Sequence, residues 1–116
     1  MIDIYGIKNC STMKKAMDWL DERNIEFTFH NYKTQAVDEA VIRLAIAQYG
    51  WESVINRRGT TWRKLSDDKK SSMDSEVAVQ IAAENPSIIK RPLLVRKQDV
   101  YLGFKADAYS SIFGKD

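Results

Sequence analysis

Cysteine and histidine are nearly absent from this chain. Its 116 residues include one cysteine, Cys10, and one histidine, His30. A single cysteine excludes an intrachain disulfide, and one cysteine with one histidine cannot assemble a structural zinc site. No spacing of carboxylates suggests a metal site built from oxygen ligands. We therefore expect a protein with no metal site and no tightly bound cofactor.

Long apolar runs are also missing. No stretch approaches the ~20 apolar residues that cross a bilayer. Residues 1–5 lack the basic region and the apolar stretch of a signal peptide. These absences predict a cytoplasmic protein that does not bind membranes.

The chain has no strong charge of one sign. It carries 18 Lys and Arg against 16 Asp and Glu, a formal net charge of +2, which makes a nucleic-acid partner improbable. The composition, 44% hydrophobic and 29% charged, is that of an ordinary globular protein. No internal repeat or low-complexity segment is visible. We expect one domain over residues 1–116, acting as a monomer.

The first third of the chain predicts a strand, a helix and a second strand. Residues 1–5 alternate in polarity, which predicts a strand, and Gly6 is expected to break it after residue 5. Apolar residues at helical spacing then predict an amphipathic helix over 11–23, with Asn24 as its stop. Residues 25–30 alternate again. A strand, helix and strand in this short span predict a parallel βαβ unit.

The rest of the chain predicts a helical insert followed by a hairpin and a helix. Helical spacing recurs over 38–49 and 74–84, residues 51–58 give no clear pattern, and 59–61 resembles a turn. Strands are expected over 92–95 and 100–102, with a closing helix over 106–113. The order is β-α-β, a helical insert at about 34–86, then β-β-α. This order predicts an α/β, thioredoxin-like fold with a mixed sheet.

Cys10 lies where the first helix is expected to begin. Free backbone N–H groups at a helix start favour an anion, so they lower the pKa of a thiol and make it a nucleophile. Lys8 and Lys14 add positive charge nearby, and the same N–H groups could hold an oxyanion. The competing interpretation is a small buried apolar residue, as most free cysteines are.

Met13 stands where a dithiol C-x-x-C motif would have its second cysteine. A thioether cannot resolve a mixed disulfide. Redox chemistry at Cys10 would therefore need a thiol from outside the chain, such as glutathione.

Three arginines are candidates for anion binding, because a guanidinium holds oxyanions and carboxylates with two hydrogen bonds. Arg57 and Arg58 precede Gly59, and Arg91 precedes Pro92. A solvated surface charge is the competing interpretation for any of them. The Arg91-Pro92 bond, at a strand start opposite the cysteine, stands where a cis-proline would line a peptide-binding groove.

The histidine and two of the tryptophans are expected to have structural roles. His30 ends a predicted strand far in sequence from Cys10, so we expect it to be structural or exposed. Trp51 and Trp62 are expected to pack within the insert.

Three segments together resemble one known family. They are residues 5–16 (YGIKNCSTMKKA), 58–65 (RGTTWRKL) and 89–94 (IKRPLL). In this order and spacing they resemble the bacterial arsenate reductase (ArsC) family, most closely its YffB-like branch, with the Spx regulators as a sister branch. The resemblance covers essentially the whole chain and implies a thioredoxin-like core with a helical insert.

The resemblance also implies roles for single residues. Cys10 would be the catalytic nucleophile, with Arg58 and Arg91 holding the oxyanion and Arg57 as the alternative to Arg58. The family's third arginine falls near Phe104, where only Lys105 supplies a charge. The family's histidine four positions before the cysteine is Gly6 here. The expected substrate-binding or glutathione-binding residues are Lys8, Asn9, Ser11, Thr12, Arg57, Pro92 and Lys105.

The resulting hypothesis is a thiol-dependent reductase that uses a glutathione or glutaredoxin-type thiol donor. Cys10 would attack a disulfide or a small arsenate-like oxyanion, with the N–H groups of residues 11–13 holding the developing charge. The alternative is a protein-binding module that contacts RNA polymerase or another protein, as Spx-type relatives do. The Spx redox switch uses a C-x-x-C pair, which Met13 removes here. A third possibility is a relative that has kept only the fold.

Overall fold

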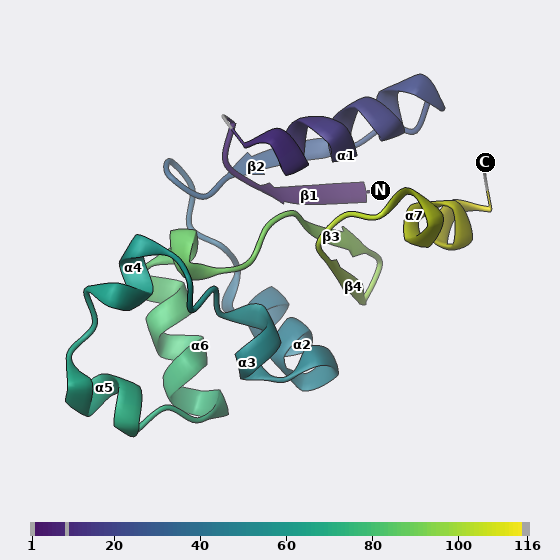
Figure 1. Cartoon of the computed structure of the whole chain (residues 1–116). Helices are drawn as coiled ribbons and strands as arrows, with labels where there is room; N and C mark the ends of the chain where they lie inside the picture. The colour runs from purple at the N-terminus through teal and green to yellow at the C-terminus, as the bar shows by residue number, and fades with distance from the viewer. Residues whose placement is uncertain (1, 9, 115–116) are drawn as a thin grey trace.

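Four short strands form one mixed sheet (Figure 1). The structure, a computed structural model, describes residues 2–8 and 10–114. The sheet has the order β2-β1-β3-β4, in which β1 pairs in parallel with β2 and antiparallel with β3, and β3 pairs antiparallel with β4. The strands are β1 (Ile2–Gly6), β2 (Thr28–Asn31), β3 (Leu93–Arg96) and β4 (Asp99–Leu102). This topology confirms the predicted thioredoxin-like α/β fold.

Helices cover both faces of the sheet. Helix α1 (Ser11–Glu22) and helix α7 (Ala106–Phe113) pack on one face, and the helices between β2 and β3 lie toward the other (Figure 1). Successive residues of a strand point to opposite faces. Leu93 accordingly joins the apolar core of the insert, and Leu94 joins the core under α1 and α7.

The insert consists of short helices around one apolar core. They are α2 (Glu39–Tyr49), α3 (Trp51–Val54), α4 (Thr60–Arg63), α5 (Asp67–Ser71), α6 (Ser75–Glu84) and the 3-10 turn η1 (Pro86–Ile88). None of the helices in the described residues has both the length and the hydropathy needed to cross a membrane.

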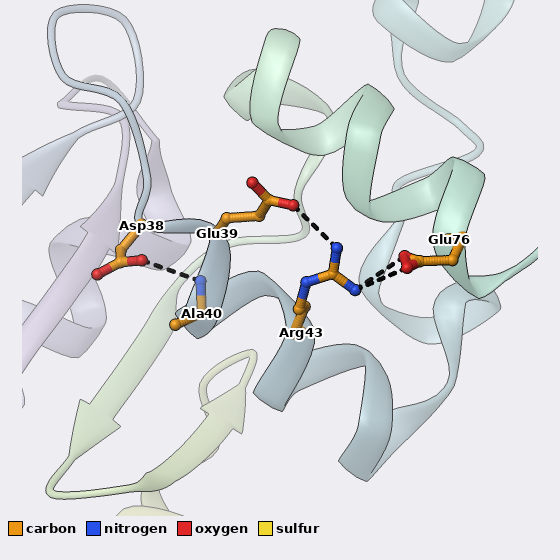
Figure 2. A network of polar contacts seen from close by, with 5 residues as sticks. All are labelled: Asp38, Glu39, Ala40, Arg43 and Glu76. Atoms are coloured by element: carbon orange, nitrogen blue, oxygen red, sulfur yellow. Dashed lines mark hydrogen bonds and ion pairs between the residues drawn. The ribbon is translucent and has the colours of Figure 1, made fainter.

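Side-chain contacts fix the two long helices of the insert relative to each other (Figure 2). Asp38 caps α2 by accepting a hydrogen bond from the backbone N–H of Ala40 at 2.9 Å. Arg43 of α2 donates a hydrogen bond to Glu39, one turn earlier in the same helix, at 3.0 Å. It also donates to both carboxylate oxygens of Glu76 in α6, at 2.9 and 2.8 Å. This exposed network joins α2 to α6.

Three local predictions are wrong. Gly6 does not break β1 but is its last residue, and its missing side chain leaves room for Met13. The second strand starts at Thr28 rather than at residue 25, because the chain is still turning out of α1 there: Asn24 has a φ of 57°, and the Ile25 N–H donates to the Leu20 carbonyl. Residues 59–61 are not a turn, since Gly59 caps the start of α4.

The segment before β3 is fixed by backbone hydrogen bonds to the insert. The Asn56 N–H donates to the Ile88 carbonyl at 2.7 Å, and the Lys90 N–H donates to the Val54 carbonyl at 2.8 Å. A β-bridge between Ile55 and Ile89 lies between these two bonds. The insert therefore determines the position of Arg91, the residue after Lys90.

Candidate functional site

Cys10 is the N-cap residue of α1, as the sequence predicts. It has an extended backbone, with φ −115° and ψ 128°, and its carbonyl accepts the first helical hydrogen bond from the Lys14 N–H at 3.0 Å. The thiol is half-buried and forms no disulfide. This position places the sulfur beside the free N–H groups of the first turn.

Cys10 packs at the edge of the core under α1 and α7, and the residues of the first turn of α1 differ in burial. Met13 is fully buried under the sheet, while Ser11 is exposed and Thr12 is half-buried. Met13 therefore takes the position of a resolving cysteine in the sequence but serves as a core side chain.

The surroundings of Cys10 favour its thiolate. Partial burial of the sulfur opposes ionisation, but the backbone N–H groups of Met13 and Thr12 and the guanidinium of Arg91 outweigh it. Together they hold the pKa of Cys10 below the ordinary value of a thiol. Arg91 acts both as a hydrogen-bond donor and through its charge. The structure thus brings together two of the three residues expected to be catalytic.

The backbone of the segment that contains Arg91 positions this residue. Its peptide bond to Pro92 is cis, as the predicted groove would require, and Pro92 is buried. The Pro92 carbonyl accepts a hydrogen bond from the Gly103 N–H at 2.9 Å. The Nε atom of Arg91 is buried and has no hydrogen-bond partner among the described residues.

Arg91 lines two cavities. One, which we call the Thr12 cavity, has a volume of about 520 Å³ and lies between the start of α1 and the segment after β4. It brings Lys105, expected to bind substrate, to the same space as Thr12 and Arg91. Its lining includes Thr12, Lys90, Arg91, Tyr101, Phe104 and Lys105.

The other, which we call the Lys33 cavity, has a volume of about 250 Å³ and lies between the end of the sheet and the insert. Its lining includes Lys33, Asn56, Thr60, Thr61, Ser87 and Arg91. The first five of these residues are not among the expected site residues. Thr60 and Thr61 belong to the motif around Gly59, but Lys33, Asn56 and Ser87 carry no local signal and meet only in the fold.

Arg57 and Arg58 lie in the segment between α3 and α4. Both are exposed and line a third cavity, of about 420 Å³, together with Glu52. The guanidinium of Arg57 lies 5.6 Å from the ring centroid of Trp51. Neither arginine lines a cavity with Arg91.

The remaining expected ligand residues lie at the surface or outside the described chain. Lys8 is exposed in the turn after β1. Asn9 lies outside the described residues. Within them, no group of three or more His, Cys, Asp and Glu side chains is placed to hold a metal ion.

His30 and the two insert tryptophans make the structural contacts expected of them. The Nε2 atom of His30 lies 2.8 Å from Asp3 Oδ1, and its ring stacks on Tyr5 with centroids 4.4 Å apart. Trp51 and Trp62 stack within the insert at 6.3 Å.

Comparison with known proteins agrees with this geometry. The model of the ArsC family matches residues 5–112. The chain belongs to the ArsC family. An uncharacterized protein of Haemophilus influenzae is 42% identical over 113 residues, which cover 97% of this chain and 99% of that protein.

Solved structures also resemble this ArsC-family protein. A protein named YffB is 43% identical, with a TM-score of 0.89 over 96% of this chain and 97% of that one. An arsenate reductase-related protein of Brucella melitensis is 42% identical, with a TM-score of 0.70 over 97% and 93% of the two chains. The predicted YffB-like resemblance is confirmed. The Spx regulators are more distant relatives, with 26% identity between this chain and Spx of Streptococcus pyogenes.

Proposed function

We propose that this ArsC-family protein is a glutathione-dependent thiol reductase that works with one cysteine. The observation that carries the proposal is the pairing of Cys10 with Arg91. The guanidinium and the N–H groups of the first turn of α1 lower the pKa of the thiol, and the thiolate is the nucleophile in thiol–disulfide exchange. Membership of the ArsC family, which includes arsenate reductases, supports the same chemistry.

The reaction with a disulfide has two steps. The Cys10 thiolate attacks one sulfur of a mixed disulfide between glutathione and a second thiol, forms an S–S bond to glutathione and expels the second thiol as a thiolate. A glutathione thiolate then attacks the glutathione sulfur bound to Cys10. This step releases oxidised glutathione and restores the Cys10 thiolate. Glutathione thereby supplies the resolving thiol that Met13 cannot.

An oxyanion such as arsenate is the second substrate class for this thiolate. Cys10 would displace one oxygen of arsenate as water. Attack of glutathione on the Cys10 sulfur would then form a Cys10–glutathione disulfide, while the arsenic takes two electrons. The chain offers Arg91 to hold such an anion, and Lys105 faces the Thr12 cavity where the family has its third arginine. The roles of Arg58 and Arg57 in anion binding stay predictions, since both line another cavity.

The disulfide reaction can be tested directly, because Cys10 is the chain's one cysteine. Incubation with oxidised glutathione should add one glutathione per chain, seen by intact mass, and reduced glutathione should remove it. Turnover of a glutathione mixed disulfide should depend on glutathione concentration and vanish in Cys10→Ser. A protein that takes up no glutathione at Cys10 at any pH up to 9 would overturn the proposal.

A protein-binding module is the second candidate. The observation in its favour is the 26% identity with Spx, a global transcriptional regulator, which covers 100% of this chain and 87% of the regulator. Met13 stands where the second cysteine of a C-x-x-C redox switch would be, so the chain cannot form that switch at this site. Stoichiometric recovery of RNA polymerase by tagged Cys10→Ser, which has no thiol chemistry, would favour this candidate.

A further inference from the structure

The Lys33 cavity has the size and the chemistry of a binding site for one end of a small ligand. Its volume of about 250 Å³ lies just below the ~300–1,000 Å³ typical of cavities for whole drug-sized ligands. We propose that it binds the glycine-end carboxylate of glutathione while the glutathione sulfur lies at Cys10. This inference rests on the proposed function and assigns a ligand subsite to residues outside the expected site.

The charges around the cavity favour an anion. Lys33 and Arg91 line it, and no Asp or Glu does. The two ends of glutathione differ in this respect, because the γ-glutamyl end carries an ammonium beside its carboxylate and the glycine end carries a carboxylate alone. A cavity with two cations and no acidic side chain fits the glycine end. The third cavity contrasts with it, since Glu52 stands there beside the arginines.

Neutral hydrogen-bond donors also face the cavity. The Oδ1 atom of Asn56 accepts the Arg58 N–H at 3.1 Å, so the Nδ2 amide is the group that Asn56 can donate to a ligand. The hydroxyls of Thr61 and Ser87 lie 3.3 Å apart and share one hydrogen bond. One of the two hydroxyl protons makes this hydrogen bond, so the second hydroxyl proton can be donated to a carboxylate oxygen.

Arg91 connects the cavity to the thiolate. It lines the cavity, and it also lowers the pKa of Cys10. Its Nε atom is buried without a partner in the described part of the chain, and a buried donor of this kind is rarely left unsatisfied. A carboxylate in the cavity would pair with the positive charge of this guanidinium. One arginine would then position both the nucleophile and its thiol co-substrate.

Binding of S-methylglutathione, which cannot react with Cys10, tests the subsite by isothermal titration calorimetry. Lys33→Met should weaken binding by up to about fivefold, as expected for one exposed ion pair. Ser87→Ala provides a second variant that leaves both cations in place, and it should also weaken binding. Lys69→Met removes a comparable exposed lysine from α5 and should leave binding unchanged.

An amidated ligand separates the subsite from general electrostatics. With the glycine carboxyl of S-methylglutathione converted to its amide, wild-type protein should bind more weakly, and Lys33→Met should cost almost nothing further. The subsite would be overturned if Lys33→Met weakened the binding of S-methylglutathione and of its amide by the same factor. It would also be overturned if wild-type protein did not bind S-methylglutathione. Lys33-dependent binding of inorganic phosphate with Lys33-independent binding of S-methylglutathione would overturn it too, since the cavity would then hold a free oxyanion.

The two proposals fail in distinguishable ways. If Cys10 still exchanges with oxidised glutathione while Lys33→Met binds S-methylglutathione like wild type, the thiol chemistry stands and the subsite is wrong. If Cys10 takes up no glutathione, the proposed function is wrong even where S-methylglutathione binds.

Discussion

The side chain of Met13 fills the space that Gly6 leaves empty. A Cβ atom on Gly6 would collide with Met13 Sδ and would lie 2.7 Å from Cε. At this point the strand that leads to the cysteine and the helix that follows it meet with only the Met13 side chain between them. The histidine that the resemblance places at position 6 cannot be accommodated here with Met13 in its present position.

Gly6→Ala should destabilise the protein by about 1–3 kcal/mol, because Met13 must move within a packed core. Urea unfolding followed by far-ultraviolet circular dichroism measures the change. Adding Met13→Ala should remove most of the extra cost of Gly6→Ala, since the clash disappears. Strictly additive losses in the double variant would show that the two residues do not interact.

Arg91→Met should raise the pKa of Cys10, because it removes a donor and a charge that favour the thiolate while burial still opposes it. The rate of alkylation by iodoacetamide against pH, read by intact mass, reports the pKa of this thiol. The midpoint should move to higher pH, and alkylation near pH 7 should slow. Lys69→Met, on the remote α5, should keep the wild-type profile, and an unshifted midpoint in folded Arg91→Met would remove this arginine from the mechanism.

The lowered pKa of Cys10 also predicts how stability depends on pH. An acid whose pKa is lower in the folded state contributes stability that is fully present above its unfolded pKa, about 8.5 for a thiol, and is lost as pH falls through the folded pKa. The free energy of unfolding of wild type minus that of Cys10→Ser should therefore rise between neutral pH and about pH 9. A flat or falling difference would mean that the folded state does not favour the thiolate.

The hydroxyl of Tyr109 is buried without a hydrogen-bond partner among the described residues, and burial raises the pKa of this side chain. A raised pKa gives stability that is present below the unfolded value of about 10 and is lost as pH rises above it. Tyr109→Phe should stabilise the protein at pH 7 by up to about 1 kcal/mol, since it removes an unsatisfied hydroxyl. It should also reduce the loss of stability between pH 10 and 11.

Urea unfolding at pH 7 and pH 11 tests both effects. Tyr32→Phe is a useful companion, because burial likewise raises the pKa of Tyr32 and its hydroxyl also lacks a partner. A loss of more than 1 kcal/mol in Tyr109→Phe at pH 7 would show that the hydroxyl is satisfied.

Local patterns were enough to predict much of the fold. The predicted helix over 106–113 has the bounds of α7, and the predicted helix over 11–23 differs from α1 by one residue. Helix α5 was missed because its residues carry no apolar periodicity and all lie at or near the surface. Its signal is the Ser66 cap, with acidic residues in the first turn and lysines in the last.

The site was only half predictable for a different reason. The position of Cys10 follows from the start of one helix, which is a local property of the sequence. The Lys33 cavity combines residues from the end of β2, the insert and the segment before β3, and only the packed chain brings them together. Arg58 lines a different cavity from the two that Arg91 lines, which motif spacing does not determine.

Backbone hydrogen bonds join Ile88 to Asn56 and Lys90 to Val54. The two halves of the molecule therefore contribute different parts of the site. One half carries the sulfur, and the other holds the arginine that makes the sulfur reactive. Melting of the insert alone would remove Arg91 but would leave the N–H groups of the α1 start beside the thiol. The pKa of Cys10 therefore reports on the insert and should rise on heating before the β1–α1 unit unfolds.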